Sequence, residues 1–429
     1  MNDVPPPTPT PGDLLTLEID AMAYGGAGVC RNGPGGRTVF VNGALPGDRV
    51  RVRLRKVKRR WLRGDAVEIL SPGPERQPAP CPVAGECGGC PWMTMKDAQQ
   101  QHWKTEFIRY PLRRFMEGVP LRFYPAPRMD AYRNRIRVHF GDRGQGPVAG
   151  FYATGSHNLV PVRNCLVALP VLNRVLAGLP APDGTGFSLE LQALPASGGV
   201  LGVIRAGRRG EIPDRSWVSS LKKMKDIKDV LLEEDLPGEF HTFAETDGIT
   251  WHHLGGTFQQ INDTMNRKVR DRVTEILRTT RPADILDLYC GNGNFSLRAA
   301  LDGIRVLGIE SSAPAIACAK HNTRVNGGAD ARWLVGDAGE PGPLLDRFNY
   351  RPDLVIADPP RSGMAGSLPA LLKAAPRVII YISCDPETLG RDLAVLSPLY
   401  EVKSVDGYDF FPHTWHVESL VLLQKRSPS

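Results

Sequence analysis

The second half of the chain alternates short apolar strands with helical stretches. Five runs are typical of strands: ADILDLYC, RVLGIE, ARWLVGD, DLVIADPP and VIIYISC. Helical runs, among them NRKVRDRVTEILRTT and SSAPAIACAKHNTRVNG, precede or separate these strands. Strands that alternate with helices build a mostly parallel sheet with helices on both faces. The pattern therefore predicts a doubly wound α/β domain over residues 261–429.

The N-terminal part of the chain has a different sequence pattern from the α/β domain. Short apolar alternations broken by glycines predict a small antiparallel barrel over residues 12–70, after a disordered leader at 1–11. Within 49–63 the chain has nine basic residues and no acid. Arg49, Arg51, Arg53 and Arg55 alternate with apolar residues, so a strand puts all four on one face. Such a stripe, in a chain of net charge +7, suits RNA phosphates, although a solvated strand face is the alternative.

Between these parts lies a region of mixed character, residues 71–260. It opens with the proline-rich linker SPGPERQPAPCP, and a helix is expected at about 96–116. Strand-like pieces such as RNRIRVHF and GVLGVIRAG then indicate an α+β domain. We find no secretory signal and no apolar stretch of about 18 residues, so we expect a cytoplasmic protein without a membrane partner. Its eight cysteines are then thiols, metal ligands or a nucleophile rather than disulfides.

A glycine-rich turn, DLYCGNGNF, follows the first strand of the α/β domain. About twenty residues later the second strand ends in Glu310, where an acid can accept hydrogen bonds from two ribose hydroxyls. The turn lacks the full G-x-G-x-x-G spacing of dinucleotide enzymes and the Lys-Ser/Thr that holds a triphosphate. These features favour S-adenosylmethionine. Asp337, at the end of the third strand, either meets the adenine edge or caps a helix.

Three further motifs fall at strand ends, where open α/β sheets bind their ligands. Asp358 opens DPPRSG, Cys384 lies in YISCDP, and Glu418 ends FPHTWHVE. Cys384 precedes Asp-Pro, which predicts a thiol at the sheet edge; a buried structural cysteine is the alternative. Glu418 lies among apolar and aromatic residues, and desolvation there raises the pKa of a carboxyl and suits a general base. The alternative for Glu418 is an exposed strand residue.

Together, DLYCGNGNF, DPPRSG, YISCDPETLGRDL and DFFPHTWHVE resemble the RNA uridine-5-methyltransferase family over nearly the whole chain. The barrel resembles the TRAM domain, an RNA-binding module with an OB-like fold. This resemblance implies a Rossmann-like S-adenosylmethionine-dependent methyltransferase domain, and the TRAM domain with the upstream cysteines favours the 23S ribosomal RNA branch over the transfer RNA branch. Two features depart from that pattern: Asp385 stands where the family usually has Asn, and the turn CGNGNF is closer to the transfer RNA branch.

The resemblance also implies a role for each motif. Cys384 attacks carbon 6 of uracil, and Glu418 removes the proton from carbon 5 after methyl transfer. The positions that match the family's cofactor contacts are Gln260, Tyr289, Asn294, Glu310, Asp337 and Asp358. The target base must leave its stack to reach the thiol.

Three cysteines follow the linker in the spacing C-x5-C-x2-C: Cys81, Cys87 and Cys90, with Cys165 as the fourth candidate ligand. Four thiolates suit zinc or a 4Fe-4S cluster. The 3+1 spacing is more typical of clusters, and the family resemblance favours 4Fe-4S, with a part in folding or RNA placement. For the whole protein we expect a monomer that methylates 23S RNA. The alternatives are transfer RNA methylation, a noncatalytic RNA-binding assembly factor and cytosine methylation.

Overall fold

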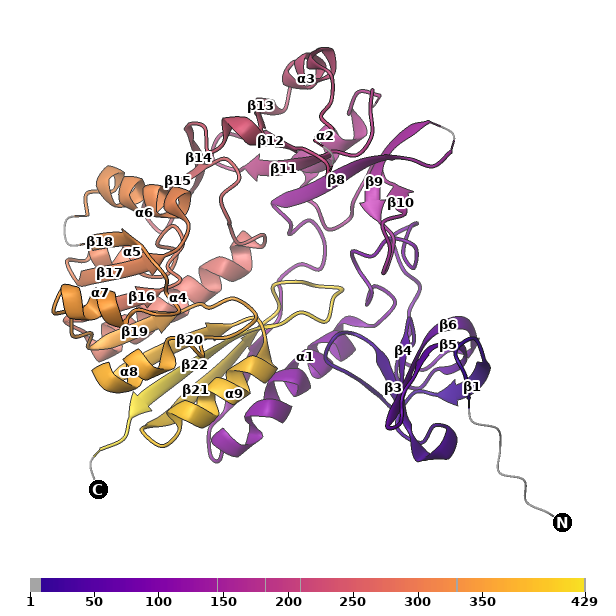
Figure 1. Cartoon of the computed structure of the whole chain (residues 1–429), viewed down its shortest axis with the longest axis horizontal. Coiled ribbons are helices and arrows are strands. Elements are labelled where there is room, and N and C mark those ends of the chain that lie inside the picture. Colours follow the sequence, from indigo (N-terminus) through magenta and orange to yellow (C-terminus); the bar gives the residue numbers. More distant parts are fainter. Residues whose placement is uncertain (1–8, 145, 182, 209, 329–330, 428–429) are drawn as a thin grey trace. The chain divides into compact units, whose positions relative to one another are not determined.

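The computed structural model describes residues 9–144, 146–181, 183–208, 210–328 and 331–427 (Figure 1). Residues 1–8 of the expected leader lie outside this part. The chain divides into two compact units, Met1–Phe107 with Phe411–His416, and Ile108–Phe410 with Val417–Ser429. Among the described residues, no helix has the length and apolarity needed to cross a bilayer.

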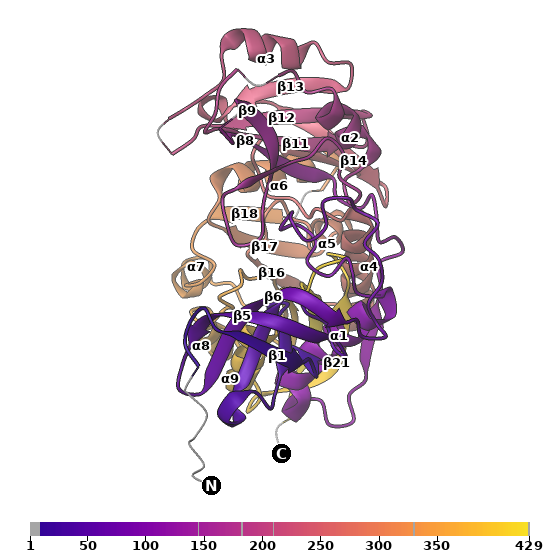
Figure 2. The same cartoon turned by 90° about the vertical axis from the view of Figure 1, so that its right-hand side faces the viewer.

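The first unit contains the expected barrel, a six-stranded sheet in the order β1-β5-β6-β4-β3-β2 (Figure 2). Its strands are β1 (Leu14–Glu18), β2 (Ala21–Met22), β3 (Gly28–Cys30), β4 (Thr38–Asn42), β5 (Arg49–Val57) and β6 (Trp61–Ser71). In β5, Val50, Val52 and Leu54 are buried while the arginines between them are exposed, as the alternation predicts. The arginine stripe therefore lies on the solvent face of the barrel.

Turns fill residues 72–96 of the first unit, and helix α1 (Asp97–Leu112) follows them. The predicted helix at about 96–116 is thus observed in slightly shorter form, with a 3-10 turn at Arg113–Phe115. Gln100 and Lys104 are buried in the first unit. Beyond the division between the units, Ile108 and Leu112 join the main hydrophobic core of the second unit.

The second unit holds an α+β region with a six-stranded sheet in the order β10-β9-β8-β11-β12-β13. Its strands are β8 (Arg135–Asp142), β9 (Pro147–Tyr152), β10 (Leu159–Pro161), β11 (Ser188–Leu194), β12 (Gly199–Arg205) and β13 (Ile227–Leu232). Helices α2 (Pro170–Ala177) and α3 (Arg215–Lys222) belong to this region. A separate hairpin, β14 (Phe240–Thr246) with β15 (Ile249–Leu254), leads to the α/β domain.

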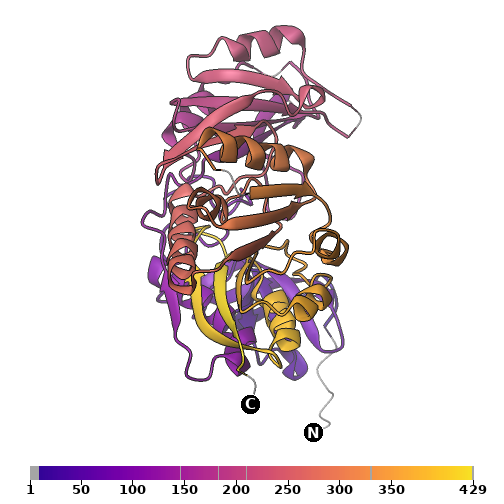
Figure 3. The same ribbon diagram turned by 90° about the vertical axis from the view of Figure 1, so that its left-hand side faces the viewer.

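The α/β domain, coloured mostly orange to yellow in Figure 3, is built on one large sheet. This sheet has eight strands in the order β18-β17-β16-β19-β20-β22-β21-β7. Its strands are β7 (Leu121–Tyr124), β16 (Asp284–Leu288), β17 (Arg305–Glu310), β18 (Ala331–Val335), β19 (Leu354–Ala357), β20 (Val378–Ser383), β21 (Tyr400–Tyr408) and β22 (Glu418–Lys425). Only β22 runs antiparallel to its neighbours among these pairs. The predicted doubly wound fold is confirmed. Strand β7 comes from the region that the sequence assigned to the central domain.

Helices cover both faces of this sheet. They are α4 (Asp263–Thr280), α5 (Leu297–Leu301), α6 (Ala313–Val325), α7 (Gly342–Arg347), α8 (Leu368–Ala374) and α9 (Pro386–Leu396). Leu286 and Leu288 of β16 pack in one core cluster with Leu371 of α8 and Leu389 of α9. Successive strand residues point to opposite faces, so Asp287 lies on the other face, near the turn that ends β16. Near the strand ends, polar side chains such as Asp287 can therefore lie outside this core cluster.

Candidate active site

Most of the predicted site residues lie at one edge of the α/β sheet. Glu310 ends β17, and Asp337 follows β18. Tyr289 follows β16, Asp358 follows β19, and Cys384 follows β20. Glu418 begins β22. Because the sheet order is β18-β17-β16-β19-β20-β22, the residues form a row in that order across the edge. The carboxyl ends of parallel strands are where such sheets bind ligands.

Cys384 and Glu418 are neighbours through strand pairing. Ser383 pairs with Ser419 in the antiparallel register of β20 and β22, and the Ser419 hydroxyl donates to the Ser383 carbonyl at 3.1 Å. The next residue along β20 is therefore beside the preceding residue of β22. Cys384 is half-buried, outside the apolar core, and Glu418 is only 8% exposed. The exposed-strand alternative for Glu418 is wrong.

Burial and nearby acids disfavour a thiolate at Cys384 in the free protein. Desolvation, then the negative charges of Glu418 and Asp358, raise the pKa of this thiol to about 12, while Arg361 opposes the shift. Desolvation also raises the pKa of Glu418 well above its usual range, with Asp358 adding to it and Arg361 again opposing. Since the thiolate is the nucleophilic form, Cys384 needs a change in its surroundings before it reacts.

Two more carboxyl groups at this edge have raised pKa values. Desolvation raises the pKa of Asp358 to about 7. Asp287 is buried; desolvation raises its pKa to about 8, although the hydrogen bond from the Ser296 hydroxyl lowers it. Among the described residues, the other carboxyl oxygen of Asp287, Oδ1, has no hydrogen-bond partner. The sequence analysis gave Asp287 no role, because a strand-end acid inside a glycine-rich motif has no distinct signal.

The glycine-rich turn is held from both ends. Tyr289 has a φ of 61°, and its hydroxyl shares a 3.0 Å hydrogen bond with the Ser367 hydroxyl. Glu310 accepts from the backbone N–H of Gly291 at 3.3 Å and from that of Ser312 at 2.8 Å. At Gly293, whose φ is 84°, an added Cβ would approach the Trp333 ring to 3.0 Å. Glycine is therefore required there for both conformation and space.

The remaining predicted cofactor residues are placed as follows. Asn294 and Asn266 exchange side-chain hydrogen bonds of 2.9 and 3.0 Å, which ties the turn to α4. The backbone carbonyl of Gln260 accepts from the Asn134 side chain at 2.9 Å. Asp337 is exposed and accepts from the Gly339 N–H at 2.7 Å, a local turn bond.

One pocket brings several of these residues together. Gln260, Tyr289, Asn294 and Asp358 line it, whereas Glu310 and Asp337 are not part of its lining. Several lining residues had no place in the sequence prediction, among them Phe243, Trp251, His253, Gln259 and Arg270. Desolvation, then the positive charges of His252 and Arg270, lower the pKa of His253 to about 3, so this imidazole is neutral.

Asp385, next to the thiol, has a structural task. Its side chain accepts from the N–H groups of Glu387 and Thr388, both at 3.0 Å, and so caps the N-terminus of α9. Its charge makes a minor contribution to the raised pKa of Cys384, after desolvation and the other two acids. An Asn at this position would serve the same capping function.

The histidines upstream of Glu418 belong to the first unit. The His413 N–H donates to the Gln100 side chain at 2.8 Å, and the Trp92 N–H donates to the His413 carbonyl at 2.9 Å. The Lys104 ammonium donates to the Phe411 carbonyl at 3.0 Å. These bonds fix the segment Phe411–His416 within that unit.

The four candidate ligand cysteines are all half-buried. Cys81, Cys87 and Cys90 lie in the turns of the first unit, where the Cys87 N–H donates to the Val83 carbonyl at 3.0 Å. Cys165 belongs to the second unit, and the Asn173 side chain bonds both its N–H and its carbonyl. Over the described ranges, no three His, Cys, Asp or Glu side chains are grouped so as to hold a metal ion.

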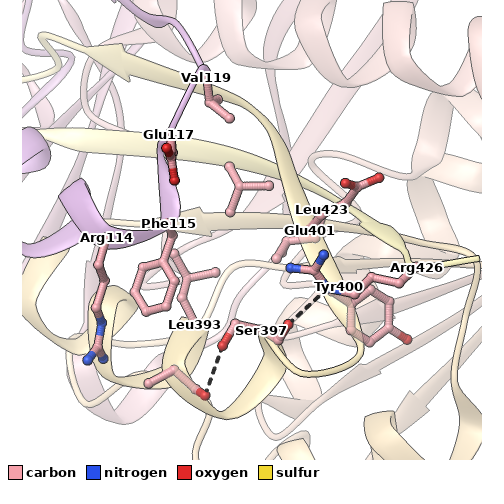
Figure 4. Close-up of a pocket in the computed structure, with 12 residues that line it drawn as sticks. Arg114, Phe115, Glu117, Val119, Leu393, Ser397, Tyr400, Glu401, Leu423 and Arg426 are labelled. Atoms are coloured by element: carbon pink, nitrogen blue, oxygen red, sulfur yellow. Dashed lines mark hydrogen bonds between the residues drawn. The ribbon is translucent and has the colours of Figure 1, made fainter. Parts of the chain in front are cut away.

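A cavity of about 570 Å³ lies at the opposite end of α9 from Cys384 (Figure 4). Arg114, Phe115, Leu393, Tyr400 and Arg426 are among the residues that line it. Its walls mix cations, acids and apolar groups, and none of the predicted site residues is among them. It is therefore separate from the row of strand-end residues.

Known proteins resemble this chain over nearly all its length. Residues 224–333 and 344–426 match the family tRNA (Uracil-5-)-methyltransferase, and residues 10–67 match the TRAM domain. The 23S rRNA (uracil(1939)-C(5))-methyltransferase RlmD of Cronobacter sakazakii is 30% identical over 428 residues, 97% of each chain. The chain belongs to the RNA uracil-5-methyltransferase family. An RNA methyltransferase of Thermosynechococcus vestitus is 32% identical and covers 96% of this chain and 98% of its own.

The fold of this RNA uracil-5-methyltransferase has a solved counterpart. The tRNA (uracil-54, C5)-methyltransferase of Pyrococcus abyssi, in complex with S-adenosyl-L-homocysteine, superposes with a TM-score of 0.73. The match covers 95% of this chain and 100% of the other, at 23% identity. The predicted enzyme class, S-adenosylmethionine-dependent RNA uracil-5-methylation, and the N-terminal TRAM domain are confirmed by these relationships.

Proposed function

We propose that this enzyme methylates carbon 5 of a uridine in 23S ribosomal RNA, with Cys384 as the nucleophile and Glu418 as the base. The observation that carries the proposal is the pairing of β20 with β22, which brings a half-buried thiol beside a buried carboxyl group at the ligand-binding edge. Relatives named as 23S RNA enzymes support the choice of substrate. An RNA substrate also supports a cytoplasmic location.

The two side chains carry out complementary steps. The Cys384 thiolate adds to carbon 6 of uracil, which makes carbon 5 nucleophilic. S-adenosylmethionine, when bound, would supply an electrophilic methyl group: carbon 5 takes the methyl, and the electron pair of the broken sulfur–carbon bond stays on sulfur as a neutral thioether. The Glu418 carboxylate then takes the proton from carbon 5, and the bond between carbon 6 and the Cys384 sulfur breaks by elimination. The negative charges of Glu418 and Asp358 help to keep the pKa of Cys384 high. A cation bound beside them, such as the sulfonium of the cofactor, would offset these charges and so favour the thiolate.

The residues present suit this cofactor. Asp358 and Asp287 are desolvated acids near the glycine-rich turn, and a buried oxygen of Asp287 has no partner among the described residues, which fits a cationic amino-acid end. Farther along the edge, Glu310 can accept from ribose hydroxyls and exposed Asp337 can meet the adenine. Tyr289, Asn294 and Gln260 line the space between. In this assignment the residues that would hold the cofactor lie at the ends of β18, β17, β16 and β19, and the end of β20 that carries Cys384 is next in the sheet order.

The roles of the two reacting residues are separable. Cys384→Ala should abolish methyl transfer. Glu418→Gln should methylate once and remain attached to the RNA, because only the elimination is blocked. The assay is labelled methyl transfer together with a denaturing gel that resolves the protein–RNA adduct. Turnover of Glu418→Gln at the wild-type rate would reject Glu418 as the base.

The substrate is identified by mapping 5-methyluridine in a strain without the gene and in its parent. Loss at a 23S site, restored by the wild-type gene but not by Cys384→Ala, is the expected result. Loss only in transfer RNA would keep the chemistry and reject the 23S assignment. No loss in either RNA would favour the noncatalytic RNA-binding alternative.

We also propose that Cys81, Cys87, Cys90 and Cys165 ligate a 4Fe-4S cluster. Three half-buried cysteines in a turn-rich segment support this, since thiolates are the usual cluster ligands. Methyl transfer from a sulfonium needs no electron, so we assign the cluster a part in folding or RNA placement rather than in redox chemistry. Anaerobically purified protein should contain iron and sulfide, and Cys87→Ser should lose both. Zinc in their place would reject the cluster and leave a structural zinc site.

A further inference from the structure

Three residues around the pocket beside the glycine-rich turn carry buried N–H groups that lack an acceptor. They are Nε1 of Trp251, Nε2 of Gln259 and Nη2 of Arg270, and none has a hydrogen-bond partner among the described residues. Trp251 is 3% exposed and Gln259 is 6% exposed. A buried donor without a partner costs roughly 1–3 kcal/mol. Three in one pocket indicate a site whose acceptor is a bound ligand.

Arg270 gives this site its charge. It lies one helical turn beyond Asn266 on α4, and its guanidinium is over the Trp251 ring at 5.2 Å. The Asp247 carboxylate is 3.6 Å from Nη2, too far for a hydrogen bond. Desolvation lowers the pKa of Arg270, but a guanidinium stays protonated in proteins. The negative charges of Asp263, Asp247 and Asp271 act on this guanidinium, and Asp263 also lines the pocket, yet Nη2 has no hydrogen-bond partner among the described residues. A charge-assisted hydrogen bond from Nη2 is therefore open to an anionic acceptor on the ligand.

The space fits a small group. The free volume is about 70 Å³, and a single water needs roughly 10–15 Å³. A carboxylate with its neighbouring atoms can enter. Tyr289, Asn294 and Asp358 line the same pocket, so it adjoins the proposed methionine end of the cofactor site.

We infer that Trp251, Gln259 and Arg270 bind the carboxylate of the cofactor's amino-acid portion. The inference rests on the proposed cofactor site and adds a specificity determinant to it. In this assignment the three N–H donors would bind the carboxylate oxygens, and Asp358, which lines the same pocket, would bind the ammonium group. The site would thus distinguish S-adenosylmethionine from analogues that lack the carboxylate.

Calorimetric titration with two ligands tests this. S-adenosylmethionine and its decarboxylated form differ only in the carboxylate, so a role in binding that group affects one ligand and spares the other. Arg270→Met should weaken S-adenosylmethionine binding roughly ten- to hundredfold, as expected for hydrogen bonds to a charged group. Its affinity for the decarboxylated form should stay at the wild-type value. Arg278→Met, on the same helix but outside this pocket, is the matched control and should change neither affinity.

Gln259→Leu, which removes an uncharged donor, provides the test if Arg270→Met does not fold, and it should show the same selectivity to a smaller degree. Equal losses for both ligands, or no loss for either, would overturn the inference. Failure of the wild-type enzyme to bind either ligand would instead count against the proposed cofactor site, so the two failures are distinguishable.

Discussion

Asp358 links cofactor binding to pH. Its pKa is raised to about 7 by desolvation, so below that pH the group is mostly protonated in the free enzyme. A cationic cofactor prefers the ionised form and must displace the proton at low pH. Affinity for S-adenosylmethionine should therefore rise as pH increases from about 6 and level off above about 7, with a slope of up to tenfold per unit from this group.

Titration calorimetry across this range measures the slope, and Asp358→Asn is expected to remove one proton from the linkage. Asp287, whose pKa is about 8, adds a second, higher transition that the variant retains. Wild-type affinity that does not change with pH would contradict this account.

The reactivity of Cys384 should depend on the charge bound next to it. In the free enzyme desolvation, Glu418 and Asp358 hold the pKa of the thiol at about 12. Sinefungin carries an amine cation where S-adenosylhomocysteine carries a neutral thioether, and the two are otherwise close in shape. Alkylation of Cys384 by iodoacetamide should be faster with sinefungin bound, because the cation favours the thiolate.

The rate is read from the mass of the peptide that contains Cys384, which separates it from the other seven cysteines. Cys384→Ser identifies the background in that peptide. The same rate with both ligands would mean that the thiol is activated by another group, for example a base that arrives with the RNA.

The positions of site residues could be predicted from the sequence where a motif is local. Cys384, Asp358 and Glu418 were each expected at a strand end, where the structure has them, while their roles in the reaction stay predictions. Trp251, Gln259 and Arg270 were not found, because they come from a hairpin, a loop and a helix that meet only in the folded chain. We identified these three residues from their buried N–H groups, which have no hydrogen-bond partner among the described residues, and not from their sequence context.

At the scale of elements, α9 depends on the residue beside the nucleophile. Asp385 caps the helix through two N–H groups, so Asp385→Ala should destabilise α9 by about 1 kcal/mol. Asp385→Asn should keep the cap and remove a charge that raises the pKa of Cys384, and the pH–rate profile should move to lower pH.

Hydrogen exchange of the first-turn amides of α9 reports the cap, and single-turnover rates report the thiol. The Asn variant is thus the control for the Ala variant. Protection equal to wild type in Asp385→Ala would show that other contacts hold the helix start.

At the scale of elements, the sequence predicted the strands that have strong apolar runs. It did not predict a strand whose pairing partner is far away in the sequence. Strands β16 to β20 follow from their sequences, and α1 was placed within a few residues. Strand β7 was not assigned to the α/β sheet, because its partner β21 lies near the other end of the chain and its residues, Leu121–Tyr124, have no pattern that names the partner. Register with a distant strand is a tertiary property.

At the scale of the whole molecule, RNA affinity depends on charge that the fold leaves uncompensated. The sequence gives β5 four equivalent arginines, but strand pairing brings acids of β6 to two of them: Glu68 lies 3.0 Å from Arg51 and Asp65 lies 2.7 Å from Arg55. Within the described residues, Arg49 and Arg53 form no ion pair. They are the members of the stripe with the greater capacity for phosphates.

Arg49→Gln with Arg53→Gln should therefore weaken RNA binding and reduce its dependence on salt. Each lost phosphate contact lowers the slope of log affinity against log salt by about 0.7–0.9, so the pair should lower it by up to about 1.8. Arg51→Gln with Glu68→Gln is the matched control, because it removes an exposed ion pair without changing the net charge, and it should leave the slope as it is. Filter binding of a 23S RNA fragment at several salt concentrations measures both. A slope that stays at the wild-type value in Arg49→Gln with Arg53→Gln would assign the RNA contacts to another surface, since the charge lost from this one would then have made no phosphate contact.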